Sequence, residues 1–160
     1  MKRQLAYLKY LIRHKFYVFV AGVEIGVNWW QLLIHDWQKF TPMEWPGYSN
    51  TFYTAAGKRR AHNEHDDTLK YAWNHHQKHC KHHWQYYFLV WDTGVQEPLK
   101  IPHRYVKEMF ADWCGAGKAI TGKWDINEWY AKNIDKMVLH AEAKEELQLL
   151  LTKWNKRDRL

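Results

Sequence analysis

Apolar residues recur every three or four positions through most of the chain, and this spacing predicts helices rather than strands. The first such segment extends from Arg3 to Val23. His14 lies three residues after Leu11 and four before Val18, so it falls on the stripe that should face the core. An imidazole at this position is either a hydrogen-bonded core histidine or a ligand.

A second, shorter helix is predicted between Asn28 and Phe40. Asn28 is a favourable N-cap, and Gln31 three residues later gives the spacing of a capping box. Pro42 ends the segment, because a proline pushes the residue before it out of the α region. The pattern therefore predicts a short helix with defined ends.

On this helix His35, Asp36 and Lys39 would lie within one turn of one another, because residues three and four apart are neighbours on a helical surface. Leu32 continues the same stripe, so this face should be buried. Burying an imidazole, a carboxylate and an ammonium group together is costly unless they pair or bind a metal. The segment is therefore the first candidate for a functional site.

The rest of the pattern predicts further helices and one small hairpin or ordered loop. A third segment has a capping-box start at Thr41 to Glu44. Later helices are expected over residues 67–85, 102–116, 124–130 and 141–155, and the hairpin between 88–91 and 99–101. No linker or internal repeat divides the sequence, so residues 1–160 are predicted to form one compact all-α bundle.

Two of these helices add polar residues to the predicted interior. His76 lies on the apolar face of the helix over residues 67–85, although a shift of one residue in helix phase would exchange it for His75. His82 and His83 follow in its last turns, and Asp112 lies on the inward face of the next helix. A solvated histidine-rich helix and a boundary or capping carboxylate are the alternative interpretations.

Charge and composition narrow the class of ligand. The chain has 24 Lys and Arg against 17 Asp and Glu, a formal net charge of +7 at pH 7 with neutral histidines. This balance favours anionic ligands such as nucleotides, nucleic acid or phosphates, with a solvated basic surface as the alternative. In the basic loop at Gly57 to Arg60, Arg59 and Arg60 could reach a substrate phosphate or belong to a solvated turn. The 11 histidines are an outlier, and histidine is the commonest metal ligand.

The cysteines and the N-terminal segment bear on the compartment. Cys80 and Cys114 are too few for a disulfide framework, which indicates a reducing compartment. Charged residues interrupt the apolar run near the N-terminus, so no signal peptide or transmembrane span is predicted. We expect a cytoplasmic protein without a membrane partner.

In chain order, the polar residues predicted to face inward are His14, His35-Asp36, a histidine cluster and Asp112. This order resembles the HD-domain superfamily of metal-dependent phosphohydrolases, an all-α fold in which these positions hold a divalent metal. His35 to Lys39 also has the H-D-x-x-K spacing of the subgroup that hydrolyses cyclic dinucleotides, and His82-His83 is similar to its paired histidines. The Gly-Tyr-Pro signature of that subgroup is absent from this sequence, so its substrate is not carried over.

Nearly the whole chain is also similar to a functionally uncharacterised family of phage and bacterial proteins. The matching segments are Arg13-His14-Lys15, His35 to Pro42, Ala72 to Trp84, Glu108-Met109 and Asp112-Trp113. Gln38 replaces the usual serine of that family, at a position not expected to bind metal. This resemblance implies a bacterium or a phage-infected host cell as the setting, and it implies no reaction.

The superfamily resemblance implies one or two divalent metals per chain. The first would be held by His14, His35, Asp36 and Asp112, and His76, His82 and His83 could complete a second. Mixed imidazole and carboxylate ligands suit Mn, Fe, Co, Ni or Zn ions, and the sequence does not choose among them. Asp36 would act through the metal, which lowers the pKa of a bound water.

The same resemblance suggests catalytic roles for two further groups. Lys39 would stabilise charge on the phosphoryl group, with Arg59 and Arg60 as additional substrate contacts. His76 could act as a general acid toward the leaving oxygen instead of binding metal.

These features favour a metal-dependent phosphohydrolase, a phosphomonoesterase or phosphodiesterase, acting on a nucleotide or another small phosphorylated compound. Two alternatives stay open: a non-catalytic HD-like binder of nucleotides or nucleic acid, and a phage interaction protein that inhibits a host system. Tryptophans and tyrosines could stack on a base, although most should belong to the core. A long nucleic acid is possible but not favoured, and a homo-oligomer is compatible with the sequence.

Overall fold

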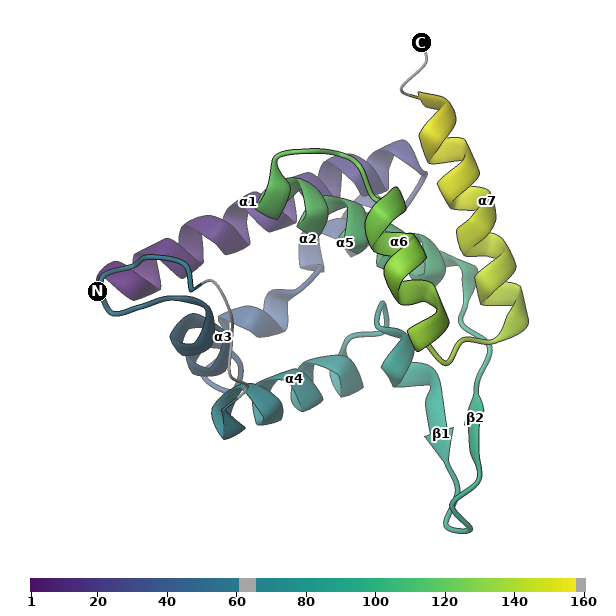
Figure 1. Ribbon diagram of the computed structural model, residues 1–160, viewed down its shortest axis with the longest axis horizontal. Coiled ribbons are helices and arrows are strands. Elements are labelled where there is room, and N and C mark those ends of the chain that lie inside the picture. The colour runs from purple at the N-terminus through teal and green to yellow at the C-terminus, as the bar shows by residue number, and fades with distance from the viewer. Residues whose placement is uncertain (61–65, 158–160) are drawn as a thin grey trace.

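The computed structural model describes residues 1–60 and 66–157, which form a mostly helical protein (Figure 1). Helices α1 (Lys2–Glu24) and α5 (His103–Thr121) run side by side through the molecule. The other α-helices are α2 (Trp29–Ile34), α3 (Trp45–Phe52), α4 (Asp67–His79), α6 (Asn127–Asn133) and α7 (Ala141–Arg157). Short 3-10 helices are η1 (Trp37–Phe40), η2 (Trp84–Tyr87) and η3 (Ile134–Lys136). The predicted all-α fold class is confirmed.

One antiparallel hairpin projects from the helices (Figure 1). Its strands are β1 (Phe88–Val90) and β2 (Gln96–Pro98), with Phe88 opposite Pro98. The hairpin was predicted, but its second strand comes before the expected segment 99–101. The chain reverses early because Gly94 adopts a positive φ of 82°, and the Trp91 N–H donates to the Val95 carbonyl across the turn.

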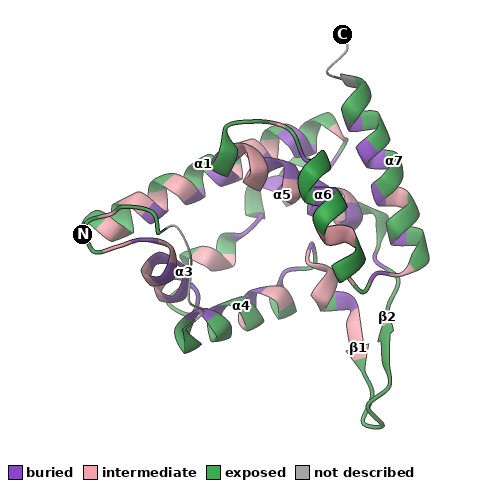
Figure 2. Ribbon diagram, viewed as in Figure 1, coloured by how far each residue is buried: buried purple, intermediate pink, exposed green. Residues whose placement is uncertain are grey.

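Two apolar clusters meet along α1. Val18 and Ala21 belong to the larger one, with residues of α5 and α7, whereas Tyr7 and Leu11 belong to a smaller one with residues of α3 and α4. His14 is buried on α1 between these positions. Figure 2 shows buried residues along the sides of α1, α4 and α5 that face the interior. The predicted core-facing stripe of the first helix is thus confirmed, and it includes His14.

A glycine on α5 allows α1 and α5 to approach closely. A Cβ atom at Gly115 would lie 2.5 Å from the backbone nitrogen of Val18 and 2.8 Å from its Cα. The close contact brings Asp112, one turn earlier on α5, toward His14, one turn earlier on α1.

The segment that carries His35 and Asp36 is not the continuous helix that the sequence predicted. Helix α2 ends at Ile34, His35 has non-helical backbone with φ −49° and ψ 131°, and Asp36 adopts the left-handed region with φ 57° and ψ 21°. Asp36 is the one non-glycine residue with positive φ among those that the structure describes. Neighbouring residues of a continuous helix point about 100° apart. The break instead buries both side chains in the same interior.

Other predicted boundaries were also wrong: the helix expected over residues 124–130 is Asn127–Asn133. Helix α3 begins at Trp45, and Thr41 does not cap it, because its hydroxyl donates to the carbonyl of Gln38. Helix α4 ends at His79, since the next residue has extended backbone, so His82 and His83 lie in a turn and not on the helix. Helix α5 continues to residue 121, beyond the expected end.

In the described part of the chain, no helix combines the length and the apolar content that a membrane crossing requires.

Candidate metal centre

Seven polar side chains from separate parts of the chain meet between α1, α4 and α5. Helix α1 supplies His14, the break after α2 supplies His35 and Asp36, α4 supplies His76, the turn after α4 supplies His82 and His83, and α5 supplies Asp112. All of them except His83 are buried. The structure thus brings together every residue that the sequence marked as a candidate metal ligand.

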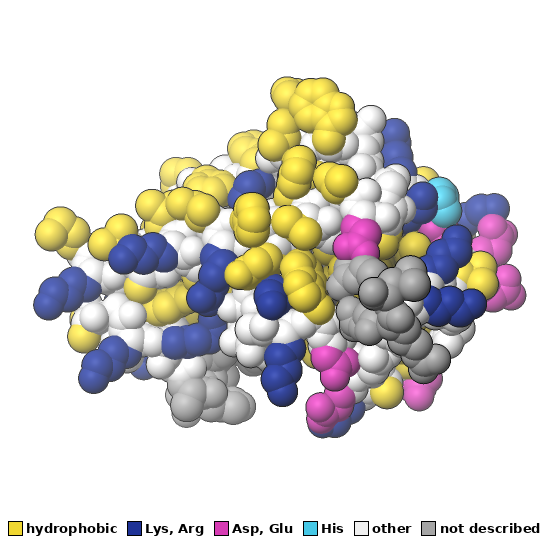
Figure 3. Space-filling model, turned by 90° about the horizontal axis from the view of Figure 1, so that it is seen from above, with side chains coloured by type: hydrophobic (Ala, Val, Ile, Leu, Met, Phe, Trp, Pro, Cys, Tyr) yellow, Lys and Arg dark blue, Asp and Glu magenta, His cyan; other side chains and the backbone are white. Residues whose placement is uncertain are grey.

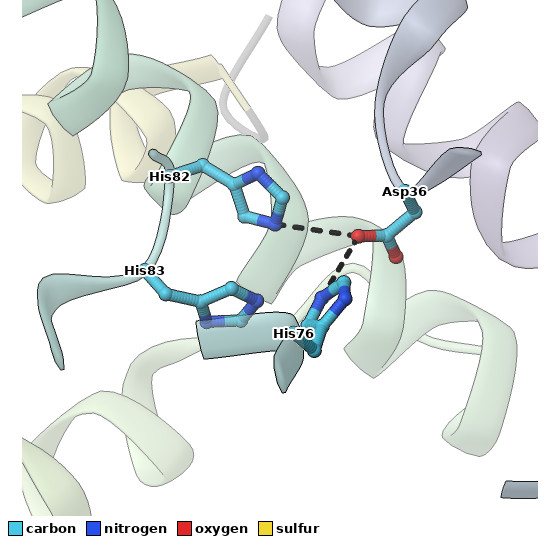
Figure 4. A group of neighbouring side chains, drawn as sticks. All are labelled: Asp36, His76, His82 and His83. Carbon is cyan, nitrogen blue, oxygen red and sulfur yellow. Dashed lines mark ion pairs between the residues drawn. The ribbon is translucent and has the colours of Figure 1, made fainter. Parts of the chain in front are cut away.

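The Asp36 carboxylate lies at the centre of this cluster. Its Oδ2 is 3.1 Å from Nε2 of His14 and 3.5 Å from Nε2 of His35. Its Oδ1 is 3.2 Å from Nε2 of His76 and 3.3 Å from Nε2 of His82, the two contacts drawn in Figure 4. The two oxygens therefore serve two different sets of histidines.

Asp112 and His83 complete two ligand groups. Oδ1 of Asp112 is 3.2 Å from Nε2 of His14 and 3.4 Å from Nε2 of His35. His83 approaches the centre of the histidine cluster from the turn after α4 (Figure 4). The first ligand group is His14, His35, Asp36 and Asp112, and the second is Asp36, His76, His82 and His83, with ligand atoms within 4.8 Å of one another in each.

Seven side-chain atoms of these groups are buried without a hydrogen-bond partner among the described residues. They are Nδ1 of His14, Nε2 of His35, His76, His82 and His83, and Oδ1 of Asp36 and of Asp112. An unsatisfied buried polar atom costs about 1–3 kcal/mol. Three of the Nε2 atoms, those of His35, His76 and His82, lie 3.2–3.4 Å from the two carboxylate oxygens, in ion pairs that require a proton on the histidine. With neutral histidines, a bound cation in each group would satisfy the Nε2 atoms and the carboxylate oxygens.

The chemistry of the donor atoms fits a divalent transition metal, because imidazole nitrogens and carboxylate oxygens are mixed in each group. Burial lowers the pKa of His83 well below its usual value, and His82 and His76 lower it further, so its ring offers a neutral nitrogen. His35 behaves differently. Burial opposes its charge, but Asp36 and the other carboxylates raise its pKa to about 9, so a metal must displace a proton there.

Glu108, for which sequence analysis suggested no role, holds two of the histidine rings from the side away from Asp36. Its Oε1 is 2.9 Å from Nδ1 of His35 and 3.4 Å from Nδ1 of His82. Burial opposes its charge, yet these two histidines lower the pKa of Glu108 to about 2. A carboxylate at Nδ1 keeps the proton on that nitrogen and leaves the Nε2 lone pair free for a metal. Glu108 therefore orients one ligand from each group.

Glu44, to which the sequence analysis gave no role in the site, holds two histidine rings of α4 in a similar way. Its Oε2 is 2.9 Å from Nδ1 of His76, and its Oε1 is 2.7 Å from Nδ1 of His75. Glu44 is fully buried. The contacts settle the helix phase that the sequence left open, since His76 faces Asp36 whereas His75 lies at the edge of the cluster. The signal that could have revealed Glu44 was a carboxylate directly before an apolar helix.

Lys39 lies at the cluster as the sequence predicted, although it is on η1 and not on a continuous helix. Its Nζ is 2.5 Å from Oδ2 of Asp36. Burial disfavours the charged amine, but Asp36 raises its pKa well above the usual value. The side chain is 16 % exposed, so the ammonium group lies between the buried carboxylate and the surface.

The two predicted substrate-binding arginines lie outside the ligand groups. The guanidinium of Arg59 is 5.1 Å from the ring centre of Tyr10, and the Tyr10 ring is 6.1 Å from that of His14. Arg59 is thus separated from the first ligand group by one aromatic ring. Arg60 is exposed, and its backbone N–H donates to the carbonyl of Phe52. The structure therefore keeps Arg59 near the site and gives no site contact for Arg60.

A cleft with a volume of about 710 Å³ reaches the cluster from the side of α2. Three cationic side chains line it, those of Lys81, Arg104 and Lys107, together with the indoles of Trp30 and Trp37. The cleft is also lined by His35, Asp36, His82 and Glu108 of the cluster. No salt bridge between described residues involves the three cations. The cleft can therefore hold a small anion that also has an aromatic or apolar part.

A model of DUF5662, a family of unknown function, matches residues 3–153 of the chain. No curated protein and no solved structure gives a significant match. These comparisons attach no activity to the cluster. They also leave the similarity to the HD-domain superfamily untested, so it stays a prediction.

Proposed function

The chain belongs to DUF5662, a family of unknown function, and we propose that it is a metal-dependent phosphohydrolase acting on a nucleotide or another small phosphorylated compound. The observation that carries the proposal is the convergence of buried, unpartnered imidazole and carboxylate atoms around Asp36. The order of these residues in the sequence, which resembles the HD-domain pattern, supports the same reaction class.

Bound divalent cations would supply a Lewis acid for a phosphoryl oxygen and would lower the pKa of a coordinated water. The protein itself would contribute a fixed set of ligands. Because Asp36 belongs to both groups, a substrate at one group also lies beside the other. Glu108 and Glu44 hold the histidine rings in the orientation that points Nε2 into the cluster.

Lys39 and His76 take different roles in this proposal. The Lys39 ammonium lies at the edge of the cluster and would stabilise negative charge on the phosphoryl group. His76 has Nδ1 held by Glu44, so Nε2, which is directed at Asp36, is the nitrogen left for a metal. This arrangement favours His76 as a ligand over its alternative role as a general acid.

The cleft beside α2 supports a phosphorylated substrate with a planar group. Lys81, Arg104 and Lys107 would attract the phosphate, and Trp30 and Trp37 offer faces on which a base can stack. Arg59, behind Tyr10, would add to the positive potential near the first ligand group without contacting the metal.

The test combines elemental analysis of the purified protein with an assay of phosphate release. The substrates are nucleotides and generic phosphate esters, with added Mn²⁺, Co²⁺, Ni²⁺ or Zn²⁺. We expect one or two transition-metal ions per chain, and loss of both metal and turnover in Asp36→Asn. A matched control is Glu128→Gln, because this exposed carboxylate pairs with Lys132 on the surface of α6.

A protein that stays folded but takes up no transition metal from any added ion would refute the proposal. A protein that binds metal and nucleotide without turnover would favour the non-catalytic binder instead.

A further inference from the structure

The outward face of α1 is apolar, which is unusual for a helix that forms the outside of a bundle. Leu5, Ile12, Phe16 and Val23 are each more than half exposed, and they lie on the side of the helix opposite to His14. Figure 3 shows hydrophobic side chains gathered in a band over the face of the molecule that includes α1.

Helix α2 extends this surface. It packs beside α1, because Leu32 lies against Gly22, where a Cβ would come within 2.3 Å of the leucine side chain. Lys15 of α1 donates to the carbonyl of Leu33 on the same side. Leu33 is 50 % exposed and Trp29 is 59 % exposed. We call the surface formed by Leu5, Ile12, Phe16, Val20, Val23, Trp29 and Leu33 the α1–α2 face.

The size of the α1–α2 face matches a protein interface. A fully covered aromatic side chain buries about 150–250 Å², so a large side chain that is half exposed offers roughly 100 Å² at most. Six of the seven are half exposed or more and Val20 is 37 % exposed, so the face offers up to roughly 700 Å². Monomers seldom expose apolar patches larger than about 300–600 Å², whereas each partner in a standard interface buries about 800 Å².

The spacing along α1 is symmetric about His14. Leu5 and Val23 lie nine residues before and after it, and Ile12 and Phe16 lie two residues before and after it. A second α1, placed antiparallel and related by a two-fold axis at the level of His14, therefore sets Leu5 against the Val23 position and Ile12 against the Phe16 position of the other copy. Isologous interfaces require this self-complementarity.

We infer that the α1–α2 face binds a second copy of this chain in an antiparallel two-fold dimer. The band of α1 is about 27 Å long between Leu5 and Val23, at 1.5 Å per residue, and its side chains are spaced to interlock with those of a like helix. A lipid surface would also accept an apolar face that includes Lys9 and is bordered by Arg13, but it would gain nothing from the symmetric spacing.

The oligomeric state tests this inference directly. We expect sedimentation equilibrium of the full chain at micromolar concentration to give twice the chain mass of 19.5 kDa. Phe16→Asp should raise the dissociation constant at least tenfold and give a monomer with unchanged far-ultraviolet circular dichroism. The matched control is Leu149→Asp, because Leu149 is 62 % exposed on α7, a helix that packs against α5, and its dimer should persist.

A cross-linking experiment tests the antiparallel register. The double variant Leu5→Cys and Val23→Cys should cross-link between chains with a short bis-maleimide, because the two positions face each other. Leu5→Cys alone should not, because the two Leu5 positions would be about 27 Å apart. The native Cys80 and Cys114 are buried and should give little background.

Three results would each overturn the inference. The first is a monomer for the unmutated protein at 0.1 mM or so, a concentration that populates dimers of typical interface size. The second is efficient cross-linking of the Leu5→Cys single variant, which would mean a parallel arrangement. The third is a monomer that floats with vesicles of anionic phospholipid unless Phe16 is replaced by Asp, which would make the face a lipid-binding surface.

Discussion

Glu108→Gln is the change that most sharply separates an organised metal centre from a chance gathering of buried polar groups. Oε1 of Glu108 contacts Nδ1 of His35 at 2.9 Å and Nδ1 of His82 at 3.4 Å. Gln31 donates to the other carboxylate oxygen. Glutamine has nearly the same shape but no charge, and it replaces one acceptor oxygen by an NH₂ donor. Either the histidines or Gln31 must therefore lose an acceptor.

The expected loss follows from these contacts. Removing the partner of a ligating histidine typically lowers metal affinity 10- to 100-fold, which corresponds to about 1.4–2.8 kcal/mol of binding free energy. Because Glu108 orients His35 of the first ligand group and His82 of the second, we expect both binding steps to weaken.

The assay is a competition titration of the metal-free protein with Co²⁺ or Zn²⁺ against a chromogenic chelator. Glu128→Gln is the control for the loss of a carboxylate charge, because Glu128 pairs with Lys132 on the surface of α6. Affinities of Glu108→Gln within twofold of the unmutated protein at both steps, in a protein that remains folded, would refute the positioning role.

Three further predictions follow from the same contacts. Glu44→Gln should weaken only the step that involves His76, since Glu44 touches no ligand of the first group; equal weakening of both steps in the same titration would contradict this. Gly115→Ala should lower the free energy of unfolding by about 1–3 kcal/mol, because its Cβ would lie 2.5 Å from the backbone nitrogen of Val18. An unchanged midpoint in urea denaturation would contradict this and would mean that the two helices can separate freely. The metal-free protein should lose stability as the pH rises from 6.5 to about 9. The reason is that the pKa of His35 is about 9 in the folded protein and about 6.5 in the unfolded chain, so the folded state binds the proton more tightly. Equal or greater stability at pH 9 than at pH 6.5 in urea denaturation would contradict this prediction.

Periodicity was enough to predict the helical fold and several of the candidate ligands. His14 was assigned to the core from its spacing to Leu11 and Val18, and it is buried. His76 and Asp112 were placed inward by the same argument and also lie in the cluster. These positions could be predicted because the side of a helix that faces the core is a local property of the sequence.

The centre of the site depends on contacts that the local sequence does not encode. Nothing in the segment around Asp36 marks the left-handed backbone that ends α2 and turns both His35 and Asp36 inward. Such conformations are costly for residues with a side chain, and surrounding packing maintains them. The roles of Glu44 and Glu108 could not be predicted for a related reason. Their histidine partners, His76 and His35, are 32 and 73 residues away in the chain.

The central claim is that Asp36 joins two metal-binding groups, and the metal content of Asp36→Asn tests it most directly. The unmutated protein, loaded with Co²⁺ or Mn²⁺ and freed of excess ion, should retain up to two ions per chain by elemental analysis. Asp36→Asn, with the same helical content, should retain none, because each group loses the carboxylate oxygen around which its histidines converge. Full metal retention by Asp36→Asn would contradict the account.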